Sequence, residues 1–95
     1  MRTLLKAHFD TETSNRLVSD GTMPKVIQEA VEQLKPEAAY FAPTDGERGL
    51  YFVFDLKDSA QIPPIVEPFF QLGAKVDLEP VMNLEDLNKG LSSLG

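Results

Sequence analysis

The side chain best suited to acid–base chemistry in this sequence is its only histidine, His8. An imidazole can exchange a proton near neutral pH, so it can serve as a general base or orient a polar ligand. His8 lies in residues 2–9, where polar and apolar side chains alternate, which predicts a β-strand. Lys6 shares its face, because side chains two residues apart point the same way. The alternative to catalysis is a histidine hydrogen-bonded at a strand edge or a dimer interface.

Two tyrosines form a second group of candidates. Tyr40 and Tyr51 lie in strand-like segments, residues 38–42 and 50–56, separated by the polar loop 43–49 with an Asp-Gly turn signal. We interpret these segments as a hairpin, which places the two tyrosines near each other. Their hydroxyl groups could bind a ligand, and the alternative is that both rings pack in an interface.

Carboxylates form a third group of candidates. Asp77 and Glu79, together with Asp55, could serve acid–base chemistry or bind a hard cation such as Mg²⁺. Their spacing matches no metal-binding motif, and Lys6 and Lys75 can neutralise them. We therefore expect no metal site and no cofactor. The absence of cysteine also excludes disulfides and thiolate-bound metals.

Apolar residues at helical spacing predict two helices that would position these strands. The first begins with Thr22 as its N-cap and ends before Pro36. The second starts at Ile62 and stops at Gly73, and Pro68 is expected to bend it. Its buried side is predicted to carry Ile62, Ile65, Val66, Phe69 and Phe70. The polar segment 10–21 is expected to hold only a short helical turn.

The end of the chain supplies a fourth strand and a tail. Residues 74–79 alternate, and Pro80 indicates a strand at a sheet edge. Residues 80–95 form the tail, in which Asn83 and Asp86 predict a weak capping box that starts a short helix. The apolar side of this helix carries Leu84, Leu87 and Leu91.

This order of elements predicts one α+β domain over residues 1–95: a ferredoxin-like βαββαβ sandwich with a four-stranded antiparallel sheet, two helices on one face and a short C-terminal helix. The helix-covered face is predicted to carry Leu5, Ala7, Phe9, Ala39, Phe41, Phe52, Phe54, Val76 and Leu78. The other face carries Leu4, Lys6, His8, Ala38, Tyr40, Ala42, Tyr51, Val53, Asp55, Lys75, Asp77 and Glu79. The second set is too apolar for a solvated surface and too charged for a closed core, which favours contact with a partner sheet or a ligand over plain exposure.

The strand pattern, the aromatic segment 50–56 and the ending from Leu78 to Leu87 resemble the dimeric α+β barrel superfamily. Its members include muconolactone isomerases and cofactor-independent antibiotic-biosynthesis monooxygenases. The resemblance covers nearly the whole chain as an order of elements. It implies a homodimer in which two sheets pair face to face, with ligands inside the barrel or between sheet and helices, and a C-terminal segment that often reaches the partner. The superfamily has no universal catalytic residue, so the resemblance implies no role for a named position.

Composition narrows the range of partners. The net charge is −6 and the estimated pI is about 4.6, so we expect no basic face for nucleic acid. The N-terminal residues lack the apolar block of a signal peptide, and no run approaches the roughly 20 apolar residues of a membrane helix. The sequence therefore predicts a cytoplasmic protein without a membrane partner.

Two functional hypotheses follow. In the first, a homodimer binds a small, partly apolar molecule, with cofactor-independent oxygenase or isomerase chemistry that uses His8 and a tyrosine. The ligand-binding residues are then Lys6, Tyr40, Tyr51, Asp77 and Glu79, and an enclosed pocket lined by His8, Tyr40 or Tyr51 is expected. In the alternative, the chain is a non-catalytic dimerisation or protein-interaction module.

Overall fold

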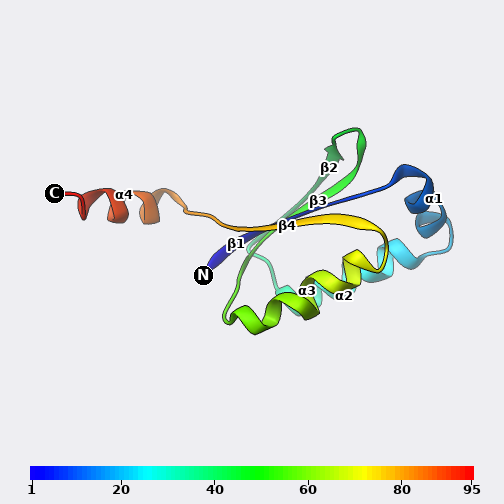
Figure 1. The fold of residues 1–95 in the computed structure, drawn as a ribbon, viewed down its shortest axis with the longest axis horizontal. Coiled ribbons are helices and arrows are strands. Elements are labelled where there is room, and N and C mark those ends of the chain that lie inside the picture. Colours follow the sequence, from blue (N-terminus) through cyan, green and yellow to red (C-terminus); the bar gives the residue numbers. More distant parts are fainter.

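The computed structural model describes residues 1–95, which form one antiparallel sheet with two helices, α2 and α3, on one face (Figure 1). The strand order is β2-β3-β1-β4. The elements are β1 (Arg2–Phe9), α1 (Thr11–Ser19), α2 (Thr22–Leu34), β2 (Ala38–Thr44), β3 (Glu47–Asp55), the 3₁₀ turn η1 (Ser59–Gln61), α3 (Ile62–Phe70), β4 (Ala74–Pro80) and α4 (Leu84–Ser92). This confirms the α+β class and is compatible with a ferredoxin-like fold.

The segment after β1 is a complete helix, α1, where only a short turn was expected. The carboxylate of Asp10 caps it by accepting a hydrogen bond from the backbone N–H of Thr13 at 2.9 Å, which also holds the pKa of Asp10 below its usual value. The spacing of apolar residues does not predict α1, because this helix is held by the Asp10 cap and by packing against α2. The hydroxyl residue Ser14 is fully buried in it.

The N-cap predicted at Thr22 is wrong by one residue. Gly21 is the cap of α2, with φ 82°, a left-handed conformation that glycine adopts without steric cost. The backbone N–H of Thr22 instead donates to the carboxylate of Asp20 at 2.9 Å. The chain therefore turns from α1 into α2 within two residues.

The predicted loop 43–49 is also shorter in the structure, because both strands of the hairpin extend into it. The turn consists of Asp45 and Gly46 alone, with φ values of 52° and 78°. Two consecutive positive φ angles are the signature of a type I′ turn, whose twist matches that of paired strands. Thr44 consequently pairs with Glu47, and Tyr40 pairs with Tyr51.

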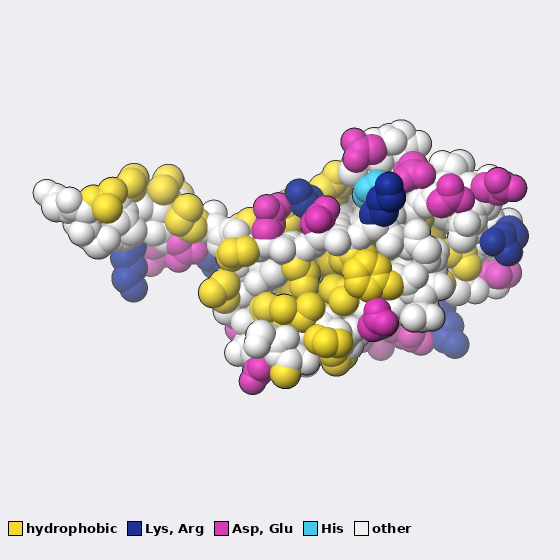
Figure 2. Space-filling model, in the orientation of Figure 1, with side chains coloured by type: hydrophobic (Ala, Val, Ile, Leu, Met, Phe, Trp, Pro, Cys, Tyr) yellow, Lys and Arg dark blue, Asp and Glu magenta, His cyan; other side chains and the backbone are white.

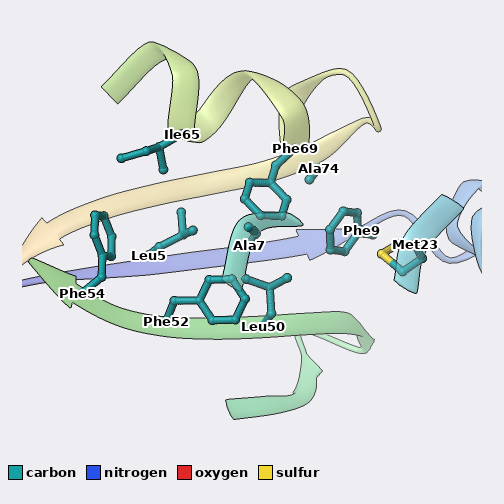
Figure 3. Close-up of a cluster of buried hydrophobic side chains, with 11 residues drawn as sticks. Leu5, Ala7, Phe9, Met23, Leu50, Phe52, Phe54, Ile65, Phe69 and Ala74 are labelled. Carbon is teal, nitrogen blue, oxygen red and sulfur yellow. The ribbon is translucent and has the colours of Figure 1, made fainter. Parts of the chain in front are cut away.

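The core lies between the sheet and helices α2 and α3 (Figure 3). Its largest buried side chains are Phe9, Phe52, Phe54, Phe69, Leu5 and Leu50, of which Leu50 was not in the predicted set. The rings of Phe9 and Phe69 meet edge to face at 6.3 Å. Central β3 and β1 therefore supply most of the core.

Four residues expected in the core are exposed: Ala39, Phe41 and Phe70, and Val31 in the apolar stripe of α2. Ala39 and Phe41 lie on β2, an edge strand that the helices leave uncovered, and Phe41 stays 56% exposed while its ring touches Phe52 edge-on at 6.0 Å. Helix α3 continues through Pro68 to Phe70, and Gly73 follows it with φ 79° at the turn into β4. The expected bend at Pro68 stays a prediction.

Helix α4 projects away from the rest of the molecule at the end of β4 (Figure 1), and the principal extents of the chain are 54 × 28 × 17 Å. The predicted capping box is confirmed, since Asn83 and Asp86 exchange hydrogen bonds of 2.8 and 3.1 Å. Asp86 also forms an ion pair with Arg2 at 2.5 Å. None of the helices has the length and apolar character that a membrane crossing requires.

Candidate functional site

The strand register arranges the candidate side chains in rows across the face that no helix covers, which we call the open face. One row runs Tyr40, Tyr51, Lys6 and Asp77 from β2 to β4. The neighbouring rows are Ala38, Val53, Leu4 and Glu79 on one side and Ala42, Gly49, His8 and Lys75 on the other. Cross-strand partners share a face, so all the predicted site residues lie on this one surface.

Lys6 is paired within the chain. Its ammonium group lies 3.0 Å from a carboxylate oxygen of Glu79, one row away on β4. The hydrogen bond to Glu79 raises the pKa of Lys6, and the charges of Glu79 and Asp77 raise it further. Figure 2 shows basic and acidic side chains gathered along the upper edge of the molecule, with the single histidine beside them. The positive charge of Lys6 is thus balanced inside one copy.

His8 is oriented by a carboxylate that the sequence analysis did not identify. Its Nδ1 lies 2.8 Å from Oε1 of Glu47, and the two side chains are 18% and 29% exposed. An ionised carboxylate only accepts hydrogen bonds, so Nδ1–H is the donor and Nε2 is left as the basic nitrogen. A histidine held this way has the arrangement of a positioned general base.

A second polar pair lies beside the first around Gly49. The hydroxyl groups of Thr44 and Tyr51 are 2.6 Å apart. A Cβ atom on Gly49 would lie 2.8 Å from the carbonyl oxygen of Ala42 and closer still to the Thr44 side chain. Glycine is therefore needed at this position, because it leaves the space into which Thr44 turns toward Tyr51. We call His8, Glu47, Thr44 and Tyr51 the hairpin cluster.

Sequence reasoning missed Glu47, Thr44 and Gly49 because it assigned residues 43–49 to a loop. The Asp45-Gly46 dipeptide is typical of a two-residue hairpin turn, and such a turn places these residues on the flanking strands. That turn pairs Thr44 with Glu47 in register, which carries both onto the open face. Of the predicted residues, Tyr40 is 66% exposed and makes no side-chain hydrogen bond.

The main cavities of a single chain lie away from the pocket that the ligand-binding hypothesis expects. None of the four main cavities is lined by His8, Tyr40 or Tyr51. No cluster of three or more His, Asp or Glu side chains is grouped so as to hold a metal ion. A ligand held on the open face would therefore need a second layer of protein above it.

These features define a small α+β domain with four antiparallel strands and one uncovered sheet face. Compared with known proteins, the chain matches no protein-family model and has no significant match among curated protein sequences. The resemblance to the dimeric α+β barrel superfamily stays a prediction.

Proposed function

We propose that the chain functions as a homodimeric domain in which two copies pair through their open faces. The observation that carries this proposal is the composition of that face: aromatic and aliphatic side chains together with polar groups, several of which are paired within the chain. Lys6 forms an ion pair with Glu79, and Glu47 accepts a hydrogen bond from His8, whereas Asp77 and Lys75 on β4 have no ion-pair partner in their own chain. Because unpaired charges are costly to bury, the paired groups lower the cost of covering this face.

The open face is too apolar to be an ordinary water-exposed surface. The uncovered side of an antiparallel sheet normally alternates to polar residues. Here Leu4, Val53 and the two tyrosines form an apolar centre instead. The face also carries both signs of charge, so it can be complementary to itself about a two-fold axis.

Sedimentation equilibrium tests the pairing directly. The wild-type chain is expected to show about twice the 10.5 kDa mass of one copy. Tyr40→Asp, a change at an exposed position, is expected to give a monomer with an unaltered circular dichroism spectrum. Val18→Asp, at an exposed apolar position on α1, is the matched control and should remain dimeric. A monomeric wild type, or a Tyr40→Asp variant that remains dimeric, would contradict the proposal.

The hairpin cluster supports a second candidate function, in which the dimer encloses a small, partly apolar molecule between its two sheets. Nε2 of His8 would take a proton from one carbon of the ligand and return it to another, while the Tyr51 hydroxyl stabilises the charge that develops on the ligand's oxygen. The composition of the ligand is unchanged by this step, as in an isomerisation. The paired hydrogen bonds that hold His8 and Tyr51 favour this candidate.

The dye 8-anilinonaphthalene-1-sulfonate, a partly apolar anion, is a suitable probe for this second function. Its addition is expected to shift the ring resonances of His8, which are unambiguous because the chain has one histidine. His8→Ala should weaken dye binding about tenfold, through loss of the hydrogen bond that Nε2 accepts from the anilino N–H of the dye, while the dimer persists. Lys25→Ala on α2 is the control. Equal dye binding by His8→Ala and wild type would exclude the His8 site.

A further inference from the structure

Strand β2 is an edge of the sheet that the rest of the chain leaves uncovered. Every residue from Ala39 to Pro43 is exposed. The strand, AAYFAPT, contains no charged side chain and has one proline, Pro43, beside the hairpin turn. The other edge strand, β4, carries three charged side chains in AKVDLEP and ends at Pro80. Charges and prolines are common means by which proteins keep a free edge from pairing with another strand. Edge β4 is protected in this way, whereas most of β2 is free to pair.

The hairpin turn decides which backbone groups of β2 point outward. In a two-residue hairpin, the residues that flank the turn form a hydrogen-bonded pair, and such pairs alternate with non-hydrogen-bonded pairs along the strands. Thr44 and its partner on β3 flank the turn here. The carbonyl oxygen of Ala42 accordingly faces β3, since it lies 2.8 Å from the position of a Cβ atom on Gly49. The N–H and C=O groups of Ala39 and Phe41 therefore point away from the sheet.

An apolar groove lies beside this edge, on the helix-covered side of the sheet. It has a volume of about 320 Å³, and its lining combines Phe41 and Leu50 of the sheet with Met23 and Ile27 of α2. Alternate side chains of a strand share a face, and so do cross-strand partners. A strand added next to β2 would therefore turn every second side chain toward the groove, with one of them directly opposite Phe41.

Arg48 is the only charged residue that lines the groove. Its Nη1 donates to side-chain oxygens of Ser14 and Asn15 at 2.8 and 2.9 Å, which holds the guanidinium in place, and no carboxylate of the chain forms an ion pair with it. A guanidinium has five N–H donors, so others remain for a carboxylate. Arg48 pairs with Pro43 at the edge of the sheet. A carboxylate on an added strand would reach it from the position opposite Pro43.

We infer that the β2 edge binds an extended segment of a partner protein, which adds a fifth strand to the sheet. The segment runs antiparallel to β2, the more stable pairing, and exchanges backbone hydrogen bonds with Ala39 and Phe41. It carries a large apolar side chain opposite Phe41 and an acidic side chain two residues earlier, opposite Pro43. In this mode of recognition, backbone hydrogen bonds supply affinity and pockets for alternate side chains supply specificity. The inference does not depend on the pairing of open faces.

Two other occupants match the edge less well. A second copy of β2 contains no carboxylate between Ala38 and Thr44, so it would leave Arg48 without an ionic partner. A small molecule could enter the groove, but it would leave the outward N–H and C=O groups unmatched. These groups repeat along the edge at the spacing of a strand, which another strand reproduces. Charge and backbone together favour an extended segment with an acidic residue.

A synthetic peptide, acetyl-TDTFTVT-amide, is a suitable probe, because its phenylalanine can lie opposite Phe41 while its aspartate lies opposite Pro43. In ¹⁵N-labelled chain it is expected to shift the amide resonances of Ala39 and Phe41 and to slow their exchange with solvent. An N-methyl group on the phenylalanine blocks an N–H that faces β2 and should weaken binding about tenfold or more. The matched control has its N-methyl group on the next threonine, whose N–H faces away, and should bind like the parent peptide. Equal affinities of the two methylated peptides would overturn the inference.

The role of Arg48 is tested with a second peptide in which asparagine replaces the aspartate. Wild-type chain is expected to prefer the aspartate peptide about tenfold, because a hydrogen bond between charged groups is stronger than one to a neutral amide. Arg48→Gln should bind the two peptides equally. A wild-type chain that does not distinguish them would show that the groove does not select an acidic segment.

A variant of the edge separates a partner segment from a second copy. Ala39→Pro removes an outward N–H at an edge position, where proline is tolerated, and should abolish peptide binding with an unaltered circular dichroism spectrum. Ala39→Val keeps the N–H and should bind like wild type. If wild-type chain without peptide sediments as a species larger than a dimer, and Ala39→Pro abolishes that species, the edge binds a second copy and the inference is wrong. The pair of methylated peptides decides the question if Ala39→Pro does not fold.

Discussion

The helix-covered face and the open face of the sheet are built from the same four strands, yet a single chain buries only the helix-covered face. On the covered face, Leu5, Phe52 and Phe54 are buried against α2 and α3. On the open face, the neighbouring Leu4, Tyr51 and Val53 remain partly exposed, and the polar groups among them bond to one another. The alternation of side chains along a strand decides which face of the sheet each side chain lies on. Whether that face is buried depends on whether a layer of helices or a second sheet covers it.

The largest expected effect separates the two faces by stability. Phe52→Ala should lower the free energy of unfolding by about 3–5 kcal/mol, because its fully buried ring leaves a cavity. Tyr40→Ala on the open face should change the stability of the monomer by about 0.5 kcal/mol or less. Urea unfolding at a concentration low enough to dissociate the dimer measures both. Similar losses in the free energy of unfolding for the two variants would show that both faces contribute equally to the stability of the monomer.

A smaller effect tests the packing of the hairpin cluster. Gly49→Ala should destabilise the chain by about 1–3 kcal/mol, because the new methyl group displaces Thr44 and the carbonyl of Ala42. Gly90→Ala is the control, since nothing lies within 4 Å of a Cβ there and alanine favours a helix by about 1 kcal/mol. Thermal unfolding of the two variants should therefore move in opposite directions. A neutral Gly49→Ala would mean that Thr44 need not turn toward Tyr51.

The smallest effect concerns pH and the edge of the open face. The terminal ammonium group of Met1 lies 2.6 Å from Asp55 and lowers the pKa of that carboxyl below 3.8. A lowered pKa stabilises the fold above about pH 3.8, and this contribution is lost as pH falls through the folded-state pKa. Asp55→Asn should flatten that part of the acid unfolding curve only slightly, because exposed pairs are screened by water.

Lys6 has the opposite dependence on pH. Its pKa is raised above 10.5 by Glu79, so the pair stabilises the fold fully below about pH 10.5, and this contribution is lost as pH rises through the raised pKa. Lys6→Met should remove the alkaline loss of stability in the unfolding curve. An alkaline limb that is unchanged in Lys6→Met would show that the Lys6–Glu79 pair does not act in solution.

The sequence predicts the elements whose signals are local and strong. The alternating residues of β1, the apolar stripe of α2 and the capping box of Asn83 are all confirmed. Prediction from the sequence fails where packing against other elements decides whether a residue is buried or a helix forms. Phe41 matches the core pattern of its strand, but β2 is an edge that no helix reaches, and α1 lacks an apolar stripe yet packs on α2.

In the candidate site, too, local features could be predicted from the sequence and contacts between distant residues could not. The face shared by His8, Lys6 and the tyrosines follows from alternation and is confirmed by the strand register. The contact between His8 and Glu47 joins residues 39 apart in sequence, and it depends on a register that the two-residue turn sets. An error of a few residues in the length of that turn was enough to remove Glu47 from the predicted site.

Isotope-filtered nuclear Overhauser measurements on a mixture of ¹³C-labelled and unlabelled chains test the central claim most directly. Only contacts between copies give signals in this experiment. We predict signals from the methyl groups of Leu4 and Val53 to the ring of Tyr40 in the other copy. Signals between copies that come instead from Val18 on α1, with none from Leu4, Val53 or Tyr40, would contradict the pairing of open faces.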